Sequence, residues 1–155
     1  MALDPTARET NVRDSLKKFF VDSIYTTEGI ALTFDKALST PRVQGIEVEK
    51  WVAVIFGEMD VDHVAEHIIN CYCCTRKDAE GFKLAQLRDK VMGYLTDPTS
   101  SDGMRRIPLY KSNVFPWVQI GGLVVYNMQE SGQLYASDET KYKVLPFRLL
   151  WAAKI

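Results

Sequence analysis

The chain has 155 residues, of which 46% are hydrophobic and 25% charged, a composition typical of one globular domain. Its 19 basic and 20 acidic residues give a formal net charge of -1, which excludes a strongly basic nucleic-acid-binding protein. No apolar run approaches the roughly 18 residues of a membrane span. We therefore expect no membrane segment and synthesis in a cytoplasm, where Cys71, Cys73 and Cys74 stay reduced.

The N-terminal part of the chain predicts an arm, a helix and a strand. Residues 1–10 are polar and predict a flexible arm, whereas residues 11–155 predict a single domain. Apolar residues recur every three to four positions over 11–25, as in an amphipathic helix that packs one face on a core. Alternation over 30–34 predicts a half-buried strand, and the polar segment 36–45 predicts a long loop.

The middle of the chain predicts two paired strands followed by a helix. Residues 46–56 alternate and then form a β-branched apolar run, which predicts the central strand of a sheet, and residues 57–62 predict a turn. Residues 63–76 predict the antiparallel partner strand. Asp78 is placed to cap a second helix, whose buried stripe we expect at Leu84, Leu87, Val91, Tyr94 and Leu95.

The last third of the chain predicts further β structure. A polar loop at 98–106 leads into a short strand at 107–110, which Pro108 assigns to an edge because proline cannot donate to a ladder. A longer strand follows at 117–128. Residues 129–141 are too many for a tight hairpin, and we expect them to project as an exposed loop.

The final predicted strand, residues 142–152, carries apolar side chains in both phases of its alternation. One phase contains Tyr142 and Val144, the other Phe147, Leu149 and Trp151, and a bulge near Pro146 reconciles them. Together the elements predict an α+β fold: an antiparallel sheet with a mixed edge, built from four to five strands, with two helices packed on one face. The long polar loops suit a subunit that forms a ring.

His63, Glu66 and His67 match the H-x-x-E-H pattern of inverted zinc proteases, in which the histidines bind zinc and the glutamate activates water. That chemistry requires a helix, because only helical spacing places both histidines on one face. The segment leads directly into the strand predicted at 63–76. A small zinc-dependent hydrolase therefore stays an alternative function only.

The other candidate groups favour structural roles. Cysteines at alternate and adjacent positions of one strand do not form a zinc knuckle, so we expect Cys71, Cys73 and Cys74 to be small core residues. We expect the tryptophans in a core or a subunit interface; they are Trp51, Trp117 and Trp151. The sequence thus predicts no enzyme, with no catalytic residue, no cofactor-binding residue and no metal ligand.

The order and spacing of these elements resemble the tail terminator family of long-tailed bacteriophages, the lambda-type minor tail proteins that close the finished tail tube. The resemblance runs from the N-terminal helix through the strands at 50–59 and 66–74, the helix after Asp78 and a hairpin at 126–151. It covers most of residues 11–153 and rests on size and element order, because the family has no catalytic motif to compare.

The resemblance implies a homohexameric ring that caps the tail-tube protein, ends polymerisation and offers its other face to a head-completion or stopper protein. Genomic DNA would pass through the lumen without sequence-specific binding, which suits a near-neutral chain. The chain would be a structural protein of the virion, at the head-proximal end of the tail, assembled in the host cytoplasm. We expect the loops at 36–45 and 130–140 to contact neighbouring subunits or the tail tube. Another neck or head-completion connector is the alternative within the virion.

Overall fold

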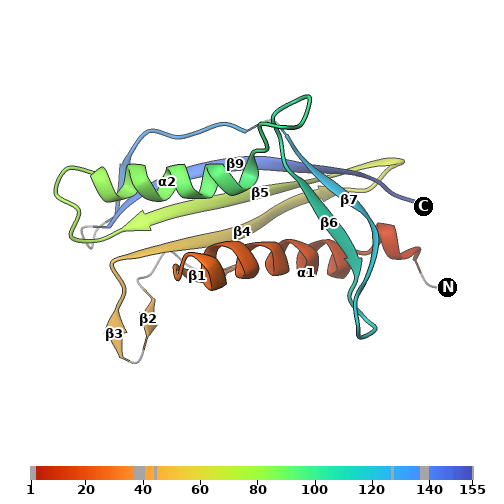
Figure 1. Cartoon of the computed structure of the whole chain (residues 1–155), viewed down its shortest axis with the longest axis horizontal. Coiled ribbons are helices and arrows are strands. Elements are labelled where there is room, and N and C mark those ends of the chain that lie inside the picture. Colours follow the sequence, from red (N-terminus) through yellow and green to blue (C-terminus); the bar gives the residue numbers. More distant parts are fainter. Residues whose placement is uncertain (1–2, 37–40, 44, 127, 137–139, 155) are drawn as a thin grey trace.

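The structure, a computed structural model, is an α+β domain in which two helices lie on one face of a curled mixed sheet (Figure 1). It describes residues 3–36, 41–43, 45–126, 128–136 and 140–154. The predicted class and the placement of both helices on one face are confirmed. The sheet has seven strands, more than the four to five predicted.

Most elements lie where the sequence pattern predicts them, with shifted ends. In chain order they are η1 (Pro5–Ala7), α1 (Glu9–Phe20), η2 (Val21–Thr27), β1 (Ala31–Phe34), β2 (Arg42–Val43), β3 (Ile46–Glu47), β4 (Lys50–Asp60), β5 (Val64–Thr75), α2 (Phe82–Leu95), β6 (Arg106–Lys111), β7 (Val118–Tyr126), β8 (Leu134–Tyr135) and β9 (Lys141–Ala152). The helix η2 continues α1 with a wider, π-helical turn. Within the described residues, no helix is long and apolar enough to cross a membrane.

The strand order of the sheet is β1-β4-β5-β9-β7-β6, and β8 pairs with β9 beyond the end of β7. β1 runs parallel to β4, and the other neighbouring strands are antiparallel. β5 and β9 form the centre because they pair along their whole length. The prediction that β4 is central is wrong, since among the described residues the four-residue β1 alone lies outside it.

β4 extends to Asp60, so the turn predicted at 57–62 is wrong for its first four residues. Gly57 lies close to the neighbouring strand, and a Cβ there would lie 3.0 Å from the carbonyl oxygen of Ile68. The pairing register with β5 shifts between Phe56 and Met59. Gly57 therefore marks a β-bulge and a close backbone approach, whereas in the sequence it reads as a turn residue.

The described part of the loop predicted at 129–141 does not project from the sheet. The backbone N–H groups of Gln129 and Ser131 donate to the carbonyls of Pro146 and Val144, at 3.1 and 3.0 Å, and β8 then pairs with β9. Residues 129–136 thus continue the pairing of β7 along β9 and add the extra strand. Residues 137–139 of this predicted loop, and 37–40 and 44 of the predicted loop at 36–45, lie outside the described residues.

β9 has no bulge near Pro146, because its register with β5 is unbroken. Both phases are apolar because both faces of the strand contact apolar neighbours. The phase toward the helices is buried and contains Leu145, Phe147, Leu149 and Trp151. The opposite phase contains Tyr142, which packs with Tyr72 beside a second small cluster around Trp51. The predicted bulge near Pro146 is therefore wrong.

The two helices bury the expected stripes against the sheet. α1 and η2 bury Val12, Leu16, Phe20 and Ile24, and α2 buries Leu84, Leu87, Val91 and Leu95. Tyr94, also predicted in the stripe, is half-buried. The predicted cap is confirmed, since the Asp78 carboxylate accepts from the backbone N–H groups of Leu84 and Lys83 at 2.9 and 3.2 Å.

The described part of the predicted N-terminal arm contacts the end of β9. Trp151 Nε1 donates to the Thr6 carbonyl at 2.8 Å, and the Lys154 N–H donates to the Thr6 hydroxyl at 2.9 Å. The Asn11 side chain donates to the Pro5 carbonyl at 2.8 Å. α1 already begins at Glu9, so the folded domain starts earlier than residue 11.

Candidate functional site

The H-x-x-E-H residues do not come together. His63 lies just before β5, and Glu66 and His67 are neighbours on the strand, so their side chains point to opposite faces of the sheet. His67 is buried beneath the helices with Nε2 at 3.2 Å from the Gly57 carbonyl oxygen, whereas Glu66 pairs with Arg148 on the other face. Within the described residues, no three His, Cys, Asp or Glu side chains are grouped to hold a metal ion.

The cysteines and two tryptophans occupy the core, as predicted. All three cysteines are buried thiols, and the hydrogen bond with Cys73 together with burial raises the pKa of Cys71 well above its usual value. Trp51 and Trp151 are buried. Trp117 is half-buried before β7, where its ring lies 6.1 Å from that of Tyr110.

The connection between β6 and β7 exposes a group of apolar side chains, which we call the hairpin knob: Val114, Phe115 and Val118. Their exposed fractions are 53%, 92% and 59%. This hairpin extends past the sheet at the end of the molecule where α1 begins (Figure 1). Single exposed apolar residues are common, but an almost completely exposed phenylalanine flanked by two exposed valines is typical of a contact surface.

Hydrogen bonds to side chains of α1 hold the base of the knob. The Ser112 hydroxyl lies 2.8 Å from the Asp14 carboxylate and 3.1 Å from Asn11 Oδ1, which also accepts from the Ser112 N–H at 3.1 Å. The Tyr110 N–H donates to the Ser15 hydroxyl at 2.8 Å. These bonds fix the hairpin on the helix and occupy donors at the free edge of β6, where Pro108 has no N–H to offer.

A groove opens at the other end of the helical layer, between α2 and the end of η2, over β1 and the start of β4. We call it the interhelical groove, and its volume is about 1020 Å³. Its apolar lining consists of Tyr25, Ile30, Ala31, Val48 and Leu87. Its rim is polar.

The charges at the rim of the groove are largely paired with one another. Lys83 lies 3.3 Å from Glu49, and Lys90 lies 3.2 Å from Glu28. Hydrogen bonds from Tyr94 and then Lys90 hold the pKa of Glu28 below its usual value. The groove is thus closer to a neutral, apolar receptor than to an anion-binding site.

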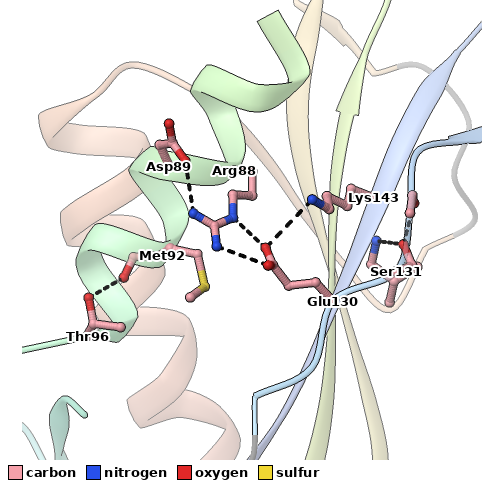
Figure 2. Close-up of polar contacts among 9 residues, drawn as sticks. Arg88, Asp89, Met92, Thr96, Glu130, Ser131 and Lys143 are labelled. Carbon is pink, nitrogen blue, oxygen red and sulfur yellow. Dashed lines mark hydrogen bonds and ion pairs between the residues drawn. The ribbon is translucent and has the colours of Figure 1, made fainter. Parts of the chain in front are cut away.

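A charged cluster attaches the segment after β7 to α2 (Figure 2). Arg88 of α2 forms a two-pronged ion pair with Glu130, with Nη2 to Oε2 at 3.0 Å, and Lys143 Nζ lies 3.8 Å from Glu130. Asp89 contacts Arg88 at 2.9 Å. The Arg88 guanidinium lowers the pKa of Glu130, and the carboxylate raises that of Arg88. The cluster contributes architecture, because it holds residues 128–136 beside the helix.

The face of the sheet opposite the helices, the open face, has no helix over it within the described residues. Its rows of half-buried apolar side chains contain Ile55, Ile68, Tyr72, Val124, Val144 and Leu150. One ion pair interrupts them, Glu66 with Arg148. Hydrogen bonds from Tyr126 and Arg148 lower the pKa of Glu66.

Comparison with known proteins gives the fold and no function. No protein-family model matches the chain, and neither does any curated protein. A solved structure whose name describes no activity has a TM-score of 0.55 to this chain, with 9% sequence identity and 96% of each chain covered. At that identity the likeness shows a shared fold alone.

The sequence analysis missed the hairpin knob. Its signal is the run Val114-Phe115-Pro116-Trp117, which is apolar where the turn between two strands is normally polar. Catalytic and metal-binding sites have characteristic side chains, whereas a docking surface consists of ordinary apolar residues in an exposed place. Only their exposure distinguishes them from core residues.

Proposed function

We propose that the chain is a structural assembly protein of the tail terminator type. It forms a homohexameric ring that caps a completed tail tube, ends polymerisation of the tail-tube protein and presents a joining surface to a head-completion or stopper protein. The family resemblance in size and element order supports this proposal. The hairpin knob carries it, because an exposed, supported apolar anchor is what a protein subunit needs to bind another protein.

The energetics of protein contacts explain why the knob matters. A few large side chains provide most of the free energy of a protein–protein contact, and aromatic residues are prominent among them. Phe115 is 92% exposed, so docking it would remove nearly its whole side chain from water. The bonds from Ser112 to Asn11 and Asp14 hold the hairpin in place before binding, which lowers the entropy lost on association.

The charge balance also suits a ring around a DNA channel. A strongly basic lumen would hold DNA through the release of counterions and would slow its passage. This chain has a net charge of -1, and described lysines and arginines such as Arg88 and Lys83 pair with carboxylates of the same chain. DNA can therefore pass through the lumen without binding tightly to the ring.

The test is a tube-capping experiment. Tail-tube protein of the same virion is polymerised with and without the purified chain, and tube lengths are measured by electron microscopy. We expect shorter tubes with a ring at one end, and a ring mass of six chains. Tubes of unchanged length at a molar excess of the chain would contradict the proposal.

A matched pair of variants links the experiment to the knob. Phe115→Asp should abolish capping, because it places a charge at the centre of an apolar contact. Tyr135→Asp is the control, since Tyr135 is 68% exposed on β8 and belongs to neither the knob nor the groove. Both variants should keep the thermal midpoint of the parent chain. Equal loss of capping in both variants would show that capping does not depend specifically on the knob.

A further inference from the structure

We infer that the hairpin knob of one copy docks into the interhelical groove of the next copy, so that the two surfaces form one head-to-tail contact. The inference rests on the proposed ring and assigns its subunit interface. It concerns two surfaces that differ in shape and lie on the same chain. Phe115 is the anchor, and the apolar floor of the groove receives it.

The positions of the two surfaces favour a head-to-tail contact. The knob lies past the beginning of α1, whereas the groove lies where η2 ends and α2 begins, toward the opposite end of the long axis (Figure 1). A contact between two different patches repeats from copy to copy and closes into a ring when the rotation allows it.

The chemistry of the two surfaces matches. The side chains of Phe115 and Val114 are apolar, and the groove offers the half-buried Ala31 and Val48 at its floor with Tyr25 exposed at its side. A volume of about 1020 Å³ is large enough to admit the side chains of Val114 and Phe115. Two aromatic rings prefer edge-to-face or offset contacts, which Tyr25 is free to form because its side chain is 59% exposed.

Other occupants fit the groove less well. An anion would find Lys83 and Lys90 already paired with carboxylates, which leaves Lys50 as the lining lysine without a carboxylate within 4.0 Å among the described residues. A different mode of association, the addition of a strand at the edge of β6, is hindered because α1 side chains already accept from the N–H groups of Tyr110 and Ser112. A neutral apolar side chain is the occupant that needs no further charge.

The size of the contact predicts how strong it is. One buried aromatic side chain removes on the order of 150–250 Å² from water. A stable interface buries about 800 Å² on each partner. The knob contact is therefore too small to hold two free copies together in dilute solution. It becomes populated when contacts close a ring or when the tube holds the subunits side by side.

Photo-crosslinking of the full chain tests the docking directly. p-Benzoylphenylalanine replaces Phe115, unlabelled and ¹⁵N-labelled copies are mixed at high concentration and on tail tubes, and crosslinked peptides are identified by mass spectrometry. We expect crosslinks between copies that reach residues 25–31 or 83–90. Crosslinks to other regions, crosslinks confined to one copy, or an absence of crosslinks would each overturn the inference.

Two further variants serve as controls for the crosslinking experiment. The same crosslinker in place of Tyr135 should give no crosslinks to 25–31 or 83–90. Gln86→Trp fills the groove from an exposed position of α2, and it should reduce the Phe115-site crosslinks at least tenfold while the thermal midpoint stays unchanged. Undiminished crosslinking in Gln86→Trp would contradict the assignment of the groove.

The outcomes separate this inference from the proposed function. If tubes are capped but crosslinks from position 115 fall outside the groove, the interface is wrong and the function stands. If crosslinks reach the groove but tube lengths do not change, the interface stands and the terminator function is wrong. Both experiments use the intact chain.

Discussion

The two faces of the sheet differ sharply although the same strands build both. On the face under the helices, Leu149 is completely buried, and on the open face its neighbour Leu150 is only half-buried. Polar groups follow the same division, since His67 is enclosed beneath the helices and Glu66 forms a solvent-accessible ion pair. Most of the core thus lies on the covered face, whereas on the open face full burial is confined, among the described residues, to the small cluster of Trp51, Ala53 and Cys74.

Substitution of the two adjacent leucines, Leu149 and Leu150, should give the largest difference in the free energy of unfolding between the two faces. Leu149→Ala removes a fully buried side chain and leaves a cavity, so we expect a loss of about 2–5 kcal/mol in the free energy of unfolding. Leu150→Ala, one residue along the strand, should cost about 1 kcal/mol. Urea denaturation of both variants measures the two values. Equal losses would mean that the open face is covered in the folded chain.

Acid should weaken the covered face through His67. Burial lowers the pKa of His67 below its usual 6.5, so the unfolded chain binds a proton more readily than the folded one. Stability from this group is present above about pH 6.5 and falls as the pH drops below that value, by at most about 1.4 kcal/mol per pH unit. Urea midpoints between pH 7 and pH 5 test this.

His67→Gln provides the control for the pH experiment. The variant keeps a polar side chain near the Gly57 carbonyl but cannot gain a charge. It should be less stable than the parent at pH 7 and should lose less stability between pH 7 and pH 5. A parent chain whose midpoint does not change over that interval would contradict the prediction.

The charged cluster at the side of α2 should have a smaller effect. Glu130→Gln removes the partner of Arg88, and because both side chains are about 30% exposed we expect a loss of about 0.5–1 kcal/mol. Amide exchange in residues 129–136 should accelerate, since the ion pair holds that segment beside the helix. The difference in stability should shrink in 1 M salt. A loss that does not depend on salt would assign the effect to packing.

A substitution on the open face should have the smallest effect on stability. Glu66→Gln breaks its ion pair with Arg148, and since that pair is accessible to solvent we expect no measurable shift of the urea midpoint. The variant is matched to Glu130→Gln, which has the same chemistry beside the helix. A clear loss of stability in Glu66→Gln would contradict this expectation and show that the ion pair stabilises the fold.

The sequence by itself determined the local elements. Helical spacing identified α1 and α2, alternation identified the strands, and Asp78 was recognised as a cap, because these patterns depend on residues a few positions apart. The strand at 63–76 also decided that His63, Glu66 and His67 do not share a helical face. Such features follow from the geometry of the backbone alone.

Only the tertiary structure decided how the elements meet. It placed β9 beside β5, laid residues 129–136 along β9, and made Gly57 a bulge where the sequence predicts a turn. It also left Phe115 exposed and opened the interhelical groove at the far end of the helical layer. Burial depends on contacts between residues far apart in the chain, so an apolar run does not by itself reveal whether it will be core or contact surface.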